Sequence, residues 1–239
     1  MYNRYMNVHT EPHQSNHQSK LNWLRAGVLG ANDGIVSTAG IIVGVAGATN
    51  SLRVILAAGI AGIIAGSISM AAGEYVSVSS SRDTEKALLD QETYELKNYP
   101  KEELEELASI YEHKGLSRNT ALQVAKELTA HDAMAAHFDA ELKIDPNNLT
   151  SPWHAAFASA ISFFVGALIP LAVMILSSES MRVMDTFVAV IVALIIAGVI
   201  SAKVGGANIL KAIIRVVTGG VLAMAVTYAI GRLFGVTGL

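Results

Sequence analysis

Residues 28–48 read VLGANDGIVSTAGIIVGVAGA, an apolar and glycine-rich run that carries one carboxylate, Asp33, near its beginning. The run has the length of about 20 residues that a helix needs to cross ~30 Å of hydrocarbon. A carboxylate inside a span costs roughly 2.5–3.5 kcal/mol on insertion scales, so it usually faces a polar cavity or a partner. The alternatives are that Asp33 is solvated near one membrane surface or only caps a turn. We predict a membrane helix in which Asp33 is a functional residue.

Composition indicates a membrane protein along the rest of the chain as well. Of the 239 residues, 52% are hydrophobic and only 15% are charged, and the mean hydropathy is +0.43. These values exceed those of most soluble domains of this size. The chain has no cysteine, which excludes disulfides and thiolate metal sites. Nucleophile motifs, phosphate-binding loops and basic nucleic-acid patches are also absent.

Five apolar segments are long enough to span a bilayer: residues 26–49, 54–77, 154–176, 183–204 and 209–234. No strand pattern competes with them, so we predict an all-α, polytopic membrane protein with a three-helix insert between the second and third spans. The predicted parts are a disordered polar tail (1–20), spans one and two (21–80), an acidic metal-binding insert (81–151) and spans three to five (152–239).

The insert differs sharply in charge from the spans. Residues 81–151 hold 15 acidic and 8 basic residues, a net charge of −7. Pro100 favours a helix start and Gly115 a helix end, which divides the insert into helices at about 82–97, 101–114 and 118–143. Pro146 and Pro152 then end the third helix and lead back to the membrane.

Basic residues near the ends of the spans predict the orientation. With the N-terminus inside, seven basic residues are cytoplasmic and three lie outside. The acidic insert is then cytoplasmic too. The inner set is Lys20, Arg25, Arg82, Lys86, Lys203, Lys211 and Arg215, and the outer set is Arg53, Arg182 and Arg232.

Several acids of the insert are spaced to share helix faces, because residues three or four apart lie on one side of a helix. Three packed helices can bring five carboxylates together, with His137 four residues before the last of them. Hard oxygen ligands suit Mn²⁺ and Fe²⁺. The simpler interpretation is a solvated acidic face, which the sequence alone favours. The carboxylates are Glu92, Glu95, Glu103, Glu106 and Glu141.

The order of these elements resembles one family. A first span with NDGIVSTAGIIVGVAGA (32–48), a second ending GSISMAAGEYVSVSSSRD (66–83), an acidic insert, and a last span with TGGVLAMAVTYAIGRLFG (218–235) is similar to the vacuolar iron transporters, in their bacterial branch. The resemblance covers nearly the whole chain after the first 20 residues. It implies a homodimer with five spans per subunit that exports Fe²⁺ and related divalent metals from the cytoplasm, across the inner (plasma) membrane, in exchange for protons.

The resemblance also implies roles for single residues. Asp33 and Met70 match the carboxylate and thioether of the membrane pathway, with Glu74 as a weaker third candidate. The four glutamates around Pro100 match the cytoplasmic metal ligands, and Glu141 matches the third-helix ligand unless a small shift places Asp139 there.

Two positions depart from the plant members of the family. Gly62 replaces an acid, which leaves the number of membrane ligands open. His137 and Phe138 replace paired methionines, which leaves the metal preference open because an imidazole replaces soft sulfur.

Small residues and the N-terminal histidines give two further expectations. Gly62 and Gly66, four apart in the second span, allow close helix contacts, and we expect bulky residues there to disturb dimerisation or transport if the pathway lies between subunits. The histidines of the tail, His9, His13 and His17, are regularly spaced, but Pro12 and the polar surroundings favour a passive, disordered tail.

Two other functions compete with transport. A membrane-bound carboxylate di-iron enzyme would use Glu-x-x-His pairs, whereas Glu127 and His131 here are four apart. A non-transporting metal sensor would need only the insert, and Asp33 inside the membrane argues against it. The prediction is therefore a transporter with no prosthetic group, whose partners are divalent metal ions, protons, the lipid bilayer and a second subunit.

Overall fold

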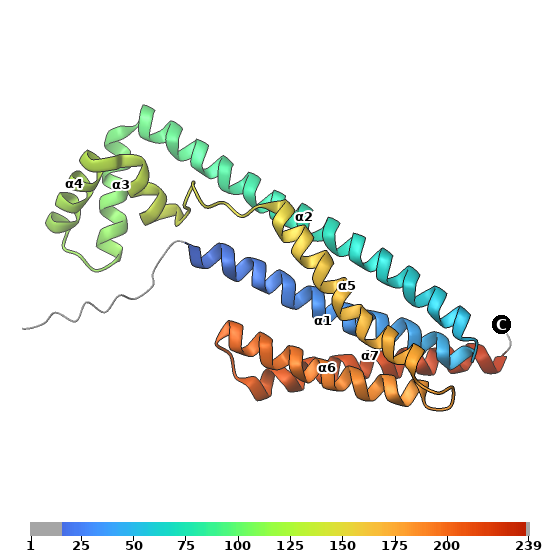
Figure 1. Ribbon diagram of the computed structural model, residues 1–239. Coiled ribbons are helices and arrows are strands. Elements are labelled where there is room, and N and C mark those ends of the chain that lie inside the picture. The colour runs from blue at the N-terminus through green and yellow to red at the C-terminus, as the bar shows by residue number, and fades with distance from the viewer. Residues whose placement is uncertain (1–15, 238–239) are drawn as a thin grey trace, which may run out of the picture. The chain divides into compact units, whose positions relative to one another are not determined.

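The computed structural model describes residues 16–237, and all of its regular structure is helical. Five helices are long and apolar enough to cross a membrane, which confirms the predicted fold class (Figure 1). They are α1 (Asn16–Ala48), α2 (Leu52–Asn98), α5 (Pro152–Leu176), α6 (Arg182–Gly205) and α7 (Ile209–Thr237). Between α2 and α5 lie α3 (Pro100–His113), α4 (Arg118–His137) and a π-helical turn, η1 (Phe138–Leu142). The predicted tail lies largely outside the described residues, including His9 and His13.

The chain divides into two compact units. The membrane unit contains Asn22–Ser80 and Thr150–Leu239, and the insert unit contains Ser81–Leu149. The predicted helix break near residue 80 is wrong, because α2 runs unbroken from Leu52 to Asn98. Neither glycine nor proline occurs between Gly73 and Pro100, so nothing in this stretch interrupts the backbone hydrogen bonds.

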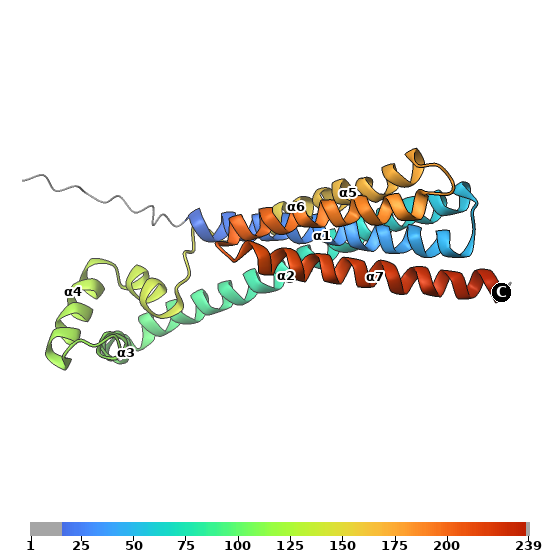
Figure 2. The same cartoon turned by 90° about the horizontal axis from the view of Figure 1, so that it is seen from below.

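Helix α1 lies at the centre of the membrane unit and packs against all four other spans. Ile42 and Val43 of α1 belong to one buried cluster with residues of α2 and α5. Ile35 and Ala39 belong to a second cluster with residues of α6 and α7. Helices α6 and α7 run side by side as an antiparallel hairpin (Figure 2). Asp33 lies on this central helix and is half-buried.

Glycines let the spans approach one another closely. A Cβ at Gly34 would overlap the carbonyl of Phe163, and a Cβ at Gly166 would overlap the carbonyl of Ala31. Backbones in such contact leave no space for a side chain. Gly62 meets the side chain of Ile41, and Gly66 meets the ring of Phe163. Both glycines of α2 therefore serve packing within the subunit.

Local signals define the helices of the insert unit. Pro100 occupies the first turn of α3, and Gly115 follows its end with a φ of +101°. The Ser117 side chain accepts a hydrogen bond from the Thr120 amide and caps α4. Leu107 and Ala108 of α3 pack on Ala125 of α4 in the core of the unit.

The third insert helix is less regular than the sequence predicts. Asp132 has non-helical angles (φ −158°, ψ 100°) inside α4, and its Oδ1 accepts a hydrogen bond from the Ala135 amide at 2.9 Å. Asp132 therefore acts as an internal N-cap that restarts the helix. Six residues later the chain enters the π-helical η1, which ends at Lys143 with a left-handed φ of 55°. The prediction of one uniform α-helix over residues 118–143 is therefore wrong.

Candidate metal centre

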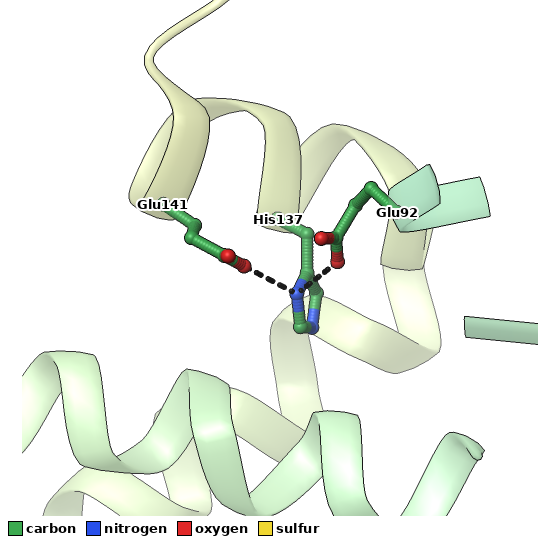
Figure 3. A group of neighbouring side chains, drawn as sticks. All are labelled: Glu92, His137 and Glu141. Carbon is green, nitrogen blue, oxygen red and sulfur yellow. Dashed lines mark hydrogen bonds and ion pairs between the residues drawn. The ribbon is translucent and has the colours of Figure 1, made fainter. Parts of the chain in front are cut away.

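A buried histidine forms the middle of the insert unit's acidic cluster. His137, at the end of α4, is fully buried, and its Nδ1 lies 2.8 Å from Oε1 of Glu92 and 3.4 Å from Oε2 of Glu141. Figure 3 shows both carboxylates pointing at the same ring nitrogen. The ligand atoms of the three residues all lie within 4.8 Å of one another. This spacing suits simultaneous contact with one metal ion.

A third carboxylate reaches the same place from α3. Glu103 Oε2 lies 3.7 Å from His137 Nδ1, and the residue is only 6% exposed, while Glu92 is 3% exposed. Neither Glu103 Oε2 nor His137 Nε2 has a hydrogen-bond partner. Buried polar atoms are rarely left without partners. A cation bound beside His137 Nδ1 would give Glu103 Oε2 a partner, so these residues fit a bound cation.

The electrostatics of the cluster agree with that conclusion. Burial, followed by the charges of four other glutamates, raises the pKa of Glu92 to about 7. Burial is also the largest cause that raises the pKa of Glu103, with the charges of neighbouring glutamates next. Carboxylates crowded in this way repel one another, and a divalent cation relieves the repulsion. The charges of Glu141, Glu103, Glu95 and Glu106 raise the pKa of Glu92. Those of Glu106, Glu95 and Glu141 raise the pKa of Glu103, which a hydrogen bond with Glu92 lowers.

The other candidate ligands lie at the edge of the cluster. Glu95 is half-buried and Glu106 is exposed, and the Glu95 side chain accepts a hydrogen bond from Gln91. Asp139 is exposed, whereas Glu141 lies beside the ring of His137. Of the two acids, the structure therefore brings Glu141 to the cluster. The structure therefore brings Glu92, Glu103, Glu141 and His137 together and leaves Glu95 and Glu106 within electrostatic range.

The sequence profile of the VIT family matches residues 24–232. The chain belongs to the VIT family. It is 43% identical over 212 residues to the vacuolar iron transporter of Acanthamoeba castellanii, which covers 88% of this chain and 78% of the relative. It is 33% identical to vacuolar iron transporter homolog 2 of Arabidopsis thaliana, over 99% of this chain and 97% of the relative. Membership makes the chain a metal ion transporter of the membrane rather than an enzyme.

The membrane residues of this VIT-family chain are more dispersed than the metal centre. Asp33 is half-buried on α1, and its backbone carbonyl accepts a hydrogen bond from Ser37 at 2.6 Å. Met70 packs against the cluster around Phe163, and Glu74 follows one turn later on α2. Within residues 16–237, no hydrogen bond or ion pair joins the side chains of Asp33, Met70 and Glu74.

Two polar residues beside these candidates were missed in the sequence. Asn32 Oδ1 and Ser67 Oγ are buried in the membrane unit without a hydrogen-bond partner. Asn32 precedes Asp33, and Ser67 lies three residues before Met70. An uncompensated polar atom is costly in hydrocarbon, so a polar residue next to an acid in a span is the signal that would have identified them.

Proposed function

We propose that the chain exports Fe²⁺, and with lower preference Mn²⁺, from the cytoplasm in exchange for protons. The buried cluster of Glu92, Glu103, His137 and Glu141 carries the proposal, because three carboxylates and one imidazole form a donor set for first-row divalent ions. The names of the relatives from Acanthamoeba castellanii and Arabidopsis thaliana refer to iron transport. Fe²⁺ also binds N and O ligands more strongly than Mn²⁺ does.

In this proposal the insert captures the ion and the spans move it. The insert and the N-terminus face the cytoplasm, since basic residues gather at the ends of the spans next to them. The cluster concentrates metal ions from the cytoplasm, which a net charge of −7 across residues 81–151 assists by attraction of cations. In this proposal the protein is a homodimer in the plasma membrane.

Asp33 is the proposed coupling group of the membrane unit. A carboxylate in a span can hold either a proton or a metal ion, and the two compete for the same oxygens. Alternation between these states links outward metal movement to inward proton movement. Met70 offers a soft sulfur ligand, and Glu74 is the second acid on the path.

Flux measurements in reconstituted liposomes test this function. A fluorophore that is quenched by Fe²⁺ reports metal movement while a pH gradient is imposed across the vesicle membrane. We expect flux that follows the pH gradient and is lost in Asp33→Asn, which keeps the size of the side chain but cannot titrate. Asp185→Asn, at the first turn of α6, is the matched control and should keep its flux. Equal flux in both variants would contradict the role of Asp33, and flux independent of the gradient would contradict antiport.

A further inference from the structure

An open groove of about 950 Å³ lies between α1, α5 and α6 of the membrane unit. It follows α1 from Leu24 to Ile35, α5 from His154 to Ile169 and α6 from Ala189 to Ile200. Its lining is aliphatic or aromatic except for His154, near one end, and Ser162. Apolar cavities of this kind do not hold water, so inside a bilayer the groove takes either an acyl chain or another helix.

The length of the groove matches one leaflet of a bilayer. Eleven residues separate Leu24 from Ile35 on α1, and a rise of 1.5 Å per residue makes this roughly 16 Å. Half of the ~30 Å hydrocarbon core is about 15 Å. The groove therefore begins at the end of the membrane unit where α1 and α5 start and reaches about the bilayer midplane along α1. Along α5, where fifteen residues separate His154 from Ile169, it runs roughly 22 Å, somewhat past the midplane.

Basic side chains gather at that same end. His154 lines the groove, Arg25 directly follows Leu24, and Lys203 lies three residues after Ile200, on the same face of α6. None of the lining residues is acidic. Basic pockets between membrane helices bind anionic lipid headgroups. An acyl chain in the groove would place its headgroup at the same end of the spans as Arg25, His154 and Lys203.

Aromatic rings mark this end as the level of the headgroups. Trp153 packs on Tyr75, with ring centroids 4.7 Å apart, and stacks on Phe157 at 6.0 Å. Phe157 itself lines the groove. Tyrosine and tryptophan concentrate at membrane–water interfaces, and the exposed Trp153 is therefore placed beside the groove entrance.

The groove lies on the opposite side of α1 from Asp33. Ala31 and Ile35, which line it, are each two residues from Asp33, or about 200° around the helix. A subunit interface built around Asp33 would leave the groove facing lipid. This favours a lipid over a second copy of the chain as the occupant.

We propose that the groove binds one acyl chain of an anionic glycerophospholipid, with the lipid phosphate held by Arg25, His154 and Lys203. The lipid fills the space between α1, α5 and α6 and stabilises their packing. The choice of a lipid over a second subunit rests on the proposed pathway at Asp33, but no candidate metal ligand contributes to the site itself.

Trp153 can report on the site directly. Trp23 and Trp153 are the two tryptophans of the chain, so Trp23→Phe leaves a single fluorophore near the groove. The protein is reconstituted in phosphatidylcholine vesicles that contain brominated phosphatidylglycerol or, at equal mole fractions, brominated phosphatidylcholine. We expect phosphatidylglycerol to half-quench Trp153 at a lower mole fraction, by about five-fold for each cation that the phosphate contacts.

Two pairs of variants separate the site from general lipid contact. Ala197→Phe fills the groove from α6 and should abolish the preference, whereas Ala225→Phe, at an exposed position of α7 outside the groove, should keep it. Lys203→Gln should reduce the preference about five-fold, and Lys211→Gln at the start of α7 should not. Circular dichroism and size exclusion confirm folding, and the lysine pair decides the matter if Ala197→Phe fails to fold.

Three results would overturn the proposal. Equal quenching by the two brominated lipids would show that no anionic lipid is selected. A preference that Lys203→Gln and Lys211→Gln lower equally would reduce it to general surface attraction. Conversion of a dimer to monomers by Ala197→Phe, with the lipid preference unchanged, would assign the groove to a subunit interface.

Discussion

Glu92 is expected to make metal binding by the insert strongly pH-dependent around neutrality. Burial and the neighbouring glutamates raise the pKa of this carboxyl to about 7, far above its ordinary value. A metal ion binds the deprotonated carboxylate, so protons compete with it as the pH falls through 7. With a pKa of about 7, the deprotonated fraction is roughly 90% at pH 8 and roughly 10% at pH 6. Affinity should therefore fall about ten-fold over this interval through Glu92 alone.

The assay is calorimetric titration of the detergent-solubilised full chain with Mn²⁺, which does not oxidise in air, at pH 6, 7 and 8 and constant ionic strength. Glu92→Gln keeps the size of the side chain and cannot titrate. This variant should bind more weakly at pH 8 and should lose the ten-fold part of the pH dependence.

Comparison of the two proteins isolates Glu92, because every other ligand of the centre is present in both. An identical pH dependence in the wild type and in Glu92→Gln would refute the reasoning. So would a wild-type affinity that is constant from pH 6 to pH 8. Either result would mean that the pKa of Glu92 in the protein is close to its ordinary value, and that burial does not control the centre.

Three further substitutions test the rest of the structure. Glu103→Ala should weaken Mn²⁺ binding by at least ten-fold in calorimetry. Glu102→Ala removes the same charge from the exposed neighbouring residue and should change the affinity little. Equal losses in the two variants would indicate only general electrostatics. Gly166→Leu should prevent a stable membrane unit, seen as loss of the monodisperse peak in size exclusion, whereas Gly73→Leu, which meets no atom within 4 Å, should leave it intact. Asp132→Ala should lower the free energy of unfolding by about 1 kcal/mol, measured by thermal unfolding, and should weaken Mn²⁺ binding. Asp132→Asn should keep both the stability and the affinity of the wild type. A stability and an affinity unchanged in Asp132→Ala would rule out the internal cap.

The spans could be predicted from the sequence because hydrophobicity and length suffice for a membrane helix. All five apolar segments are found as helices, and Pro100, Gly115 and Ser117 delimit α3 and α4 as their local preferences require. These signals act within a few residues. They do not depend on how distant segments pack.

Features that depend on packing were harder to predict. The join between the second span and the insert was placed as a break, although serines, unlike glycine or proline, interrupt a helix only weakly. The contacts of Gly62 and Gly66 required knowledge of which helices cross. A spacing of three or four residues identified the acidic faces, but it could not show that His137 stands between Glu92 and Glu141, because Glu92 is far away in the chain.

The π-helical turn at Phe138–Leu142 makes the metal centre sensitive to residue number as well as residue type. A π-turn accommodates one residue more than an α-turn in the same length of helix. The Lys143 amide closes this turn on the Phe138 carbonyl, and the Ile144 amide also donates to that carbonyl, at 3.0 Å. Removal of the exposed Asp139 would let the segment relax into a regular α-helix, with every chemical group of the centre still encoded. Glu141 would then follow His137 by three residues instead of four, about 60° from the direction of His137 around the helix axis. A single-codon deletion in this region would therefore change the angle between the two ligands without removing either one, and an alignment gap here would mark homologues whose centre has a different geometry.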